Sequence, residues 1–176
     1  MANTYELINS ISLTSTTAFG SVSFSNIPQT YKDLTLWVSA RSDRTAADGL
    51  ERVYLYMNSG TTGITMINTV VGGSSYYSDT YTTANGVGGT CGLTSNQNAP
   101  SGQFGFTMLY ISDYTSGTAK VGISSSTMAI GASGTSGYVF GQSYQRTTNS
   151  GISSISTSGL GSNWLTGSTF YLYGIK

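Results

Sequence analysis

The chain has 176 residues, and its seven Lys and Arg residues balance seven Asp and Glu residues, so that charged residues make up only 8% of the sequence. A chain with zero net charge has no long-range field to attract nucleic acid or an anionic membrane, and we expect neither as a partner. Because the sequence contains no histidine, it also lacks the commonest general base and the commonest metal ligand.

Residue composition points to strands. Ser and Thr contribute 55 residues and Gly 23, whereas helix formers never cluster at a 3.6-residue spacing. Tyr, Thr, Val, Ile and Phe recur in roughly eight to eleven short runs that Gly, Ser and Asn interrupt. No composition break or charged linker divides the chain. The sequence therefore predicts an all-β, jelly-roll-like antiparallel β-sandwich, with residues 1–176 forming a single domain.

The first expected strands are short. A run at residues 5–8 can continue to residues 11–13 beyond a break, and a second run occupies residues 19–27. Pro28 ends the second run, because a proline pushes the residue before it into extended geometry and favours a turn.

Residues 31–57 show the clearest strand pattern in the chain. Apolar residues occupy every second position from 34 to 40 and again from 53 to 57, with a polar loop that contains Gly49 between them. Two such runs joined by a polar loop predict an antiparallel hairpin. The hairpin also carries eight of the fourteen charged residues, namely Lys32, Asp33, Arg41, Asp43, Arg44, Asp48, Glu51 and Arg52.

We expect the charges around this loop to contact a neighbouring subunit or another protein of the same assembly. Mutual ion pairing on a solvated or intersubunit surface explains the cluster better than paired carboxylates for hydrolysis, or than a calcium site, whose Asp spacing is missing. Interfacial charges set orientation more than affinity, so the loop can fix the register between subunits. The predicted interface residues are Arg41, Asp43, Arg44, Asp48, Glu51 and Arg52.

The strand signal weakens between residues 74 and 105, where we expect a long surface excursion with one weak strand near residues 87–93. Long loops in compact domains are often functional. Tyr76, Tyr77 and Tyr81 lie in this region, and Tyr among Ser, Gly and Asn forms adaptable recognition surfaces. Tyrosine also half-buries the outer faces of sheets, so recognition and packing are both open for these three residues.

The most apolar segment, residues 103–112, predicts a central strand, with Phe106, Met108 and Tyr110 at alternate positions. Between the later strands, a loop at residues 160–165 carries Trp164 as a large anchor. The remaining expected strands lie at residues 64–71, 118–127, 137–146, 151–156 (weakly) and 168–176.

No residue pattern points to catalysis, a metal or a cofactor, and we expect the protein not to be an enzyme. Cys91, the single cysteine, has no positive charge beside it in the sequence, so a buried, idle thiol explains it better than a nucleophile. The N-terminus has no signal-peptide pattern, and no apolar run is long enough to span a bilayer. A glycan hydrolase that uses carboxylates such as Asp79 or Asp113 is the least favoured hypothesis.

One segment is distinctive enough to suggest relatives. The phrase Ile27-Pro-x-Thr-Tyr-x-Asp-Leu34, continued by residues 37–43, resembles small β-sandwich virion proteins of tailed bacteriophages. The two ends of the chain, residues 1–8 and 170–176, are similar to the ends of the same unit. The resemblance implies a capsid decoration (cement) protein or a tail-fibre component, both commonly trimeric, and brings no catalytic residues.

We therefore expect a structural virion protein, made in the host cytoplasm, that trimerises and stabilises the exterior of the phage head. Its partners would be further copies of itself and the major capsid protein or other virion proteins. The absence of a collagen-like, coiled-coil or β-helical shaft favours decoration over a fibre. The alternative is a tail-fibre or receptor-binding module that binds host surface glycan through the Tyr-rich region.

Overall fold

A computed structural model describes residues 4–17, 22–46, 49–59, 64–72, 75–83, 89–130, 136–146 and 150–176. Within these residues the chain forms twelve strands in two antiparallel sheets and no helix. In spatial order, the large sheet contains β1 (Tyr5–Ser12), β12 (Thr169–Ile175), β3 (Asp33–Ala40), β8 (Gly105–Ile111), β9 (Lys120–Ile130), β10 (Ser136–Arg146), β5 (Ile64–Gly72) and β6 (Ser75–Thr83). The small sheet contains β2 (Val22–Phe24), β11 (Ile155–Ser158), β4 (Leu50–Met57) and β7 (Gly89–Ser95).

Eight of the twelve strands follow the path of one long hairpin rolled into two sheets. β1 pairs with β12 and β3 with β8 in the large sheet, whereas β2 pairs with β11 and β4 with β7 in the small sheet. Strands from the two ends of the chain are therefore neighbours. This connectivity is that of a jelly roll, and it confirms the predicted all-β sandwich.

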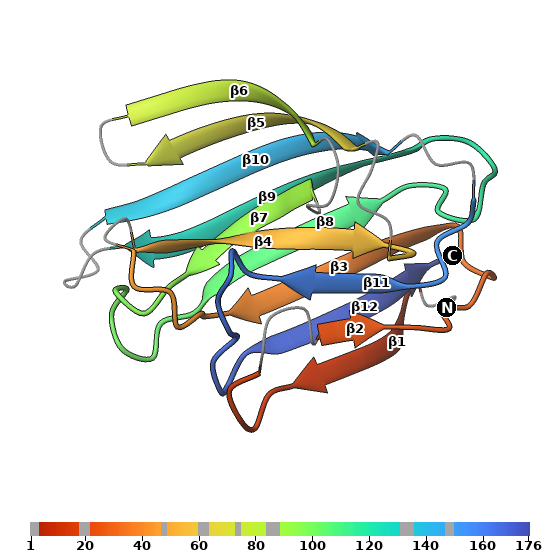
Figure 1. Cartoon of the computed structure of the whole chain (residues 1–176). Helices are drawn as coiled ribbons and strands as arrows, with labels where there is room; N and C mark the ends of the chain where they lie inside the picture. The colour runs from red at the N-terminus through yellow and green to blue at the C-terminus, as the bar shows by residue number, and fades with distance from the viewer. Residues whose placement is uncertain are drawn as a thin grey trace.

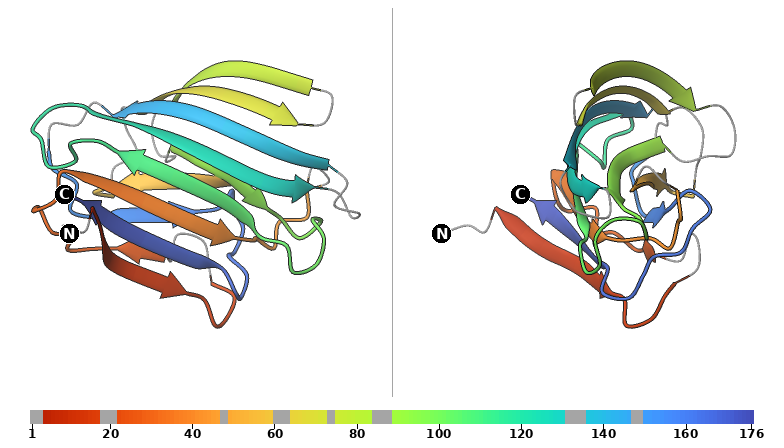
Figure 2. Two further views of the ribbon diagram at one scale, coloured as in Figure 1. Left: turned by 180° about the vertical axis from the view of Figure 1, so that it is seen from behind. Right: turned by 90° about the vertical axis from the view of Figure 1, so that its left-hand side faces the viewer.

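Two additional strand pairs enlarge one sheet only. The β5 and β6 pair follows β4 in the chain, and the β9 and β10 pair follows β8. Both pairs join the large sheet beyond β8, so β10, β5 and β6 extend past the small sheet (Figure 1). Figure 2 shows the two layers from behind and from one side.

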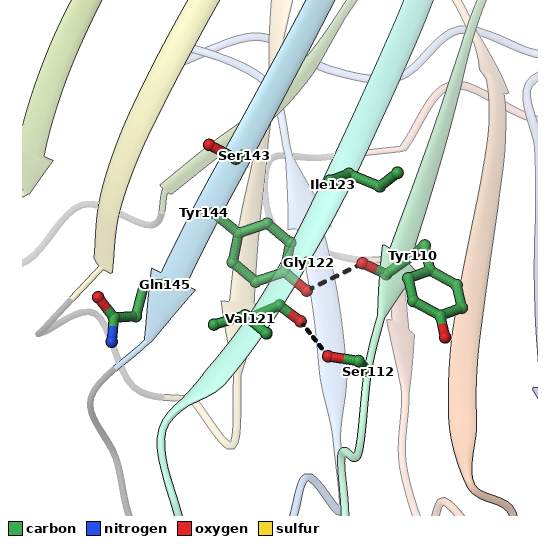
Figure 3. A pocket seen from close by; sticks show the side chains of 8 residues that line it. All are labelled: Tyr110, Ser112, Val121, Gly122, Ile123, Ser143, Tyr144 and Gln145. Atoms are coloured by element: carbon green, nitrogen blue, oxygen red, sulfur yellow. Dashed lines mark hydrogen bonds between the residues drawn. The ribbon is translucent and has the colours of Figure 1, made fainter.

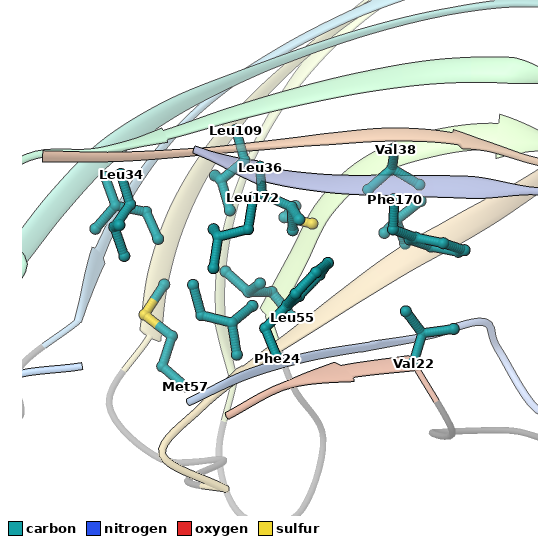
Figure 4. Close-up of a cluster of buried hydrophobic side chains, with 14 of the residues drawn as sticks. Val22, Phe24, Leu34, Leu36, Val38, Leu55, Met57, Leu109, Phe170 and Leu172 are labelled. Carbon is teal, nitrogen blue, oxygen red and sulfur yellow. The ribbon is translucent and has the colours of Figure 1, made fainter. Parts of the chain in front are cut away.

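The main core lies between the small sheet and the half of the large sheet that contains β12, β3 and β8. Apolar residues at alternate positions of β3, such as Leu34 and Leu36, point at β4 residues such as Leu55 and Met57 (Figure 4). These four side chains are at most 2% exposed. Burying a side chain of this size contributes about 1.5–3 kcal/mol, so the two facing rows account for much of the stability of the sandwich.

The structure corrects the predicted hairpin at residues 31–57. β3 pairs with β12 and β8, while β4 lies in the other sheet between β11 and β7. A hairpin would set the two apolar rows side by side on one face of a sheet. The observed connection sets them opposite each other across the core, where each row covers the other and both are removed from water.

The structure also corrects the long excursion expected at residues 74–105. Residues 75–83 form β6, the outermost strand of the large sheet, because hydroxyl-bearing and aromatic residues suit a strand as well as aliphatic ones do. The weak strand expected at residues 87–93 is confirmed as β7. Two other expectations also hold: β8 is central in its sheet, and Trp164 is fully buried. The break expected after residue 8 is absent, because β1 is continuous and has only a register shift between Leu7 and Asn9.

β7 lies unusually close to the large sheet. Side-chain hydroxyls of the large sheet bond to its backbone: Thr107 Oγ1 donates to the carbonyl of Leu93 (2.9 Å), and Ser126 Oγ accepts from the amide of Leu93 (3.0 Å). A Cβ atom at Gly92 would overlap with the side chains of Thr107 and Ser126. The polar residues buried here therefore hold the two sheets together, and the close approach requires glycine.

Gly92→Ala is expected to lower the free energy of unfolding by about 1–3 kcal/mol, because the added methyl group forces the two sheets apart. The matched control is Gly141→Ala, a β10 position where a Cβ atom would meet nothing within 4 Å. The control should leave stability unchanged or raise it slightly, since alanine restricts the unfolded chain. Urea unfolding measures both, and equal losses at the two positions would contradict the proposed overlap.

Candidate functional site

The outer face of the large sheet, which points away from the small sheet, carries most of the exposed large apolar side chains. Among the described residues, seven of the eight such side chains lie there, and they are 36–60% exposed. Soluble monomers rarely expose contiguous apolar patches of this kind without a function. The seven residues are Tyr5, Leu7, Phe106, Met108, Val121, Ile123 and Val139.

The alternation of side chains along β8 shows why this face is apolar. Leu109 and Ile111 are fully buried in the core, so Phe106, Met108 and Tyr110 necessarily point outward. Both faces of this strand are therefore apolar, a pattern typical of strands buried on both sides. That pattern is the sequence signal for the outer face, and our sequence-based site prediction did not use it.

Four aromatic side chains on β3, β8 and β12 form a cluster that we call the aromatic ridge: Trp37, Phe106, Tyr171 and Tyr173. The Trp37 ring centroid lies 6.4 Å from that of Phe106, edge to face, and 5.0 Å from that of Tyr173. The two tyrosine rings stack at 6.4 Å. Such ring pairs contribute about 0.5–1.5 kcal/mol each beyond burial, so the ridge is a fixed feature of the surface.

Polar groups of Trp37, Tyr110 and Asp33 on the outer face are bonded within the chain. Trp37 Nε1 donates to Thr35 Oγ1 (3.1 Å), and the Tyr110 hydroxyl donates to Asp33 Oδ2 (2.6 Å). The other Asp33 carboxylate oxygen accepts from the amide of Asp113 (2.8 Å). The bond to Asp33 is the main cause that raises the pKa of Tyr110 to about 12, and partial burial adds to it. These rings consequently present apolar surface without needing water to satisfy their polar ends.

Next to the ridge, the outer face has a hollow of about 570 Å³ across β8, β9 and β10 (Figure 3). The register places Tyr110, Ile123 and Ser143 in one row across these three strands. Val121 and Ile123 give the hollow apolar walls, 50% and 60% exposed. The lining residues are Tyr110, Ser112, Val121, Gly122, Ile123, Ser143, Tyr144 and Gln145.

Arg41, a predicted interface residue, acts inside its own chain. Its side chain is nearly buried at 9% exposure, and it lies at the end of β3. The guanidinium donates four hydrogen bonds of 2.8–3.2 Å to backbone carbonyls between Asn96 and Pro100, in the loop that follows β7. The planar fork of donors suits such a set of carbonyls, so Arg41 fixes this loop against β3.

Two predicted interface carboxylates hold the loop that follows β11. Glu51 is fully buried and accepts hydrogen bonds from the backbone amide of Leu160 (2.9 Å) and from the hydroxyl of Ser162. Asp43 accepts from the backbone amide and the side-chain amide of Asn163 (2.8 and 2.7 Å). Asp43 and Glu51, like Arg41, thus bind neutral loop groups in place of the mutual ion pairs that the sequence suggested.

The intersubunit role of the predicted interface residues stays a prediction. The burial of Arg41 and Glu51 leaves Arg52, which is exposed, and Asp43 and Arg44, which are partly exposed, as those that a partner could reach. Asp48 lies outside the described residues.

The glycan-recognition role also stays a prediction. Tyr76, Tyr77 and Tyr81 belong to β6, whose backbone pairs with β5, and their side chains lie outside the described residues.

The described part of the chain has few other candidates for chemistry. It contains no group of three or more His, Cys, Asp or Glu residues that could hold a metal ion. It also contains no helix of the length and apolarity needed to cross a membrane.

Cys91 lies in β7 at 2% exposure, and burial raises the pKa of its thiol to about 12.

Cys91 should not react with a thiol reagent at pH 8 while the protein is folded, because a thiol with a pKa of about 12 is almost wholly protonated there and is also shielded. One equivalent should react on unfolding in denaturant. The absorbance of the coloured group that the reagent releases measures the reaction in the folded and in the unfolded protein. Rapid labelling of the native protein would contradict the buried position in β7.

Arg41→Lys should lower the free energy of unfolding by about 1–3 kcal/mol, because an ammonium cannot reproduce four fork-shaped bonds to the carbonyls of residues 96–100. Arg52→Lys, an equal change at an exposed position, should alter stability by less than about 0.5 kcal/mol. Denaturant unfolding compares the two variants. Equal effects on the two variants would show that the four hydrogen bonds of Arg41 do not stabilise the fold.

Comparison with known proteins adds no identification. No family model matches the chain, and no curated protein and no solved structure matches it either.

Proposed function

We propose that this protein is a structural subunit of a phage virion, acting as a capsid decoration (cement) protein on the exterior of the head. The observation that carries the proposal is the apolar outer face of the large sheet, with seven exposed large apolar side chains among the described residues of a chain that is only 8% charged. A surface of this kind is suited to permanent contact with other protein surfaces. The resemblance of residues 27–43 to phage virion proteins supplies the biological setting.

The polar groups of the described residues support a structural role. Asp33, Asp43 and Glu51 each accept hydrogen bonds from loops or side chains of their own chain, and the Arg41 side chain donates to backbone carbonyls. These groups stabilise loops at both ends of the sandwich. Of the carboxylates that the sequence offered for hydrolysis, Asp43 and Glu51 are thus engaged in holding loops of their own chain, as suits a rigid structural subunit.

A tail-fibre or receptor-binding module remains the alternative. It rested on a long Tyr-bearing loop, whereas the residues concerned form β6 at the edge of the large sheet. No observation on the described residues favours glycan recognition by this strand over decoration.

Quantitative proteomics of purified virions tests the decoration role. The protein should be present at a copy number comparable to that of the major capsid protein, because a decoration protein occupies the repeating capsid lattice. Capsid protein from the same sample provides the internal standard, and heads separated from tails locate the signal. A few dozen copies or fewer, or recovery with the tail fraction, would overturn the proposal in favour of a tail component.

A further inference from the structure

We infer that a second copy of this chain covers the outer face of the large sheet, with the aromatic ridge of one copy lying in the hollow of the other. The inference rests on the proposed assembly function and deepens it, since it names the partner and the surface.

The shape of the outer face provides both halves of such a contact. The ridge side chains on β3, β8 and β12 are bulky, whereas Gly141 and Ser143 on β10 are small. A Cβ atom at Gly141 would meet nothing within 4 Å, so the surface is open there. Bulky and small positions side by side on one face allow two identical surfaces to interlock, as a two-fold contact between like subunits requires.

The charges of the face permit two copies to meet. Among the described outward positions of β1, β12, β3, β8, β9 and β10, Asp33 is the only charged residue, and it is 7% exposed. Glu6 on the edge strand pairs with Lys176 at 2.7 Å. Because the whole chain also has zero net charge, neither local nor long-range repulsion opposes a pair of identical chains.

The hydrogen bonding of the ridge favours a protein partner over a sugar. A glycan binds aromatic rings best when neighbouring polar groups are free to bond its hydroxyls. On this face, the Trp37 indole N–H and the Tyr110 hydroxyl already donate to Thr35 and Asp33. The exposed edges of Trp37 and Phe106 are therefore apolar surface, which another apolar face covers without leaving their polar groups unpaired.

The area is sufficient for a specific contact. Six strands about 4.8 Å apart, each presenting about 20 Å of its length, give on the order of 600 Å² per copy. Two copies would bury about 1,200 Å², above the roughly 1,000 Å² that a specific interface needs.

Light scattering coupled to size exclusion, over a range of concentrations, tests the inference on the full chain. We expect an assembly of at least two copies for the unmodified protein. Ile123→Arg places a charge in the hollow, and Gly141→Arg places a long side chain in open space beside it. Each should weaken self-association about tenfold or more. Leu160→Arg is the matched control, because Leu160 is 44% exposed but lies in a loop off this face.

Thermal unfolding checks separately that the variants fold, because both substitutions are at solvent-exposed or open positions and should leave a cooperative melting transition. A monomer at all concentrations overturns the inference, as does an assembly that both face variants leave intact. Weakening by the Leu160 variant equal to that of the face variants also overturns it. Self-association through this face with a low virion copy number would overturn only the decoration role, and a monomer abundant in virions would overturn only this inference.

Discussion

The packing of β3 against β4 across the core is the interaction on which the rest of the structure depends. Each strand has one apolar row, and the rows face each other from opposite sheets, with Leu34 and Leu36 on one side and Leu55 and Met57 on the other. Once these strands belong to different sheets, the chain must cross between layers at their connection. The antiparallel partners β8 and β7 then follow the same crossing in reverse, which produces the rolled hairpin of a jelly roll.

Where the chain crosses between the sheets, its loops must be held in place. Several of the few charged side chains hold them through hydrogen bonds. Arg41, at the crossing, binds carbonyls after β7, while Asp43 and Glu51 bind donors after β11. A buried charge is tolerated because several hydrogen bonds compensate the loss of water. Since these side chains are used inside the molecule, the outer sheet face retains hardly any charge and offers apolar and hydroxyl-bearing surface instead.

The same use of charge explains why the charged residues and the exposed apolar residues lie in different parts of the molecule. The concentration of charge at residues 41–52 indicated an interface, because charges at an interface can set the orientation of the partner. The structure instead places Arg41 and Glu51 in the interior and leaves the apolar residues of β8 and β9, among them Phe106 and Ile123, on the surface. The sequence shows that β8 has apolar residues on both of its faces. Alternation does not tell which of the two faces packs on the core and which is left for a partner.

The sequence by itself determined the all-β class, most strand positions, the central place of β8 and the anchoring role of Trp164, because alternation, turn residues and the scarcity of helix formers are local properties. Only the tertiary structure decided that β3 and β4 separate into two sheets, that residues 75–83 join a sheet edge, and that Trp37, Phe106 and Tyr173 meet on one outer face. These features depend on pairing between residues far apart in the chain, since β1 meets β12 and β3 meets β8. Local patterns carry no information on which distant strand supplies the hydrogen bonds and the covering side chains.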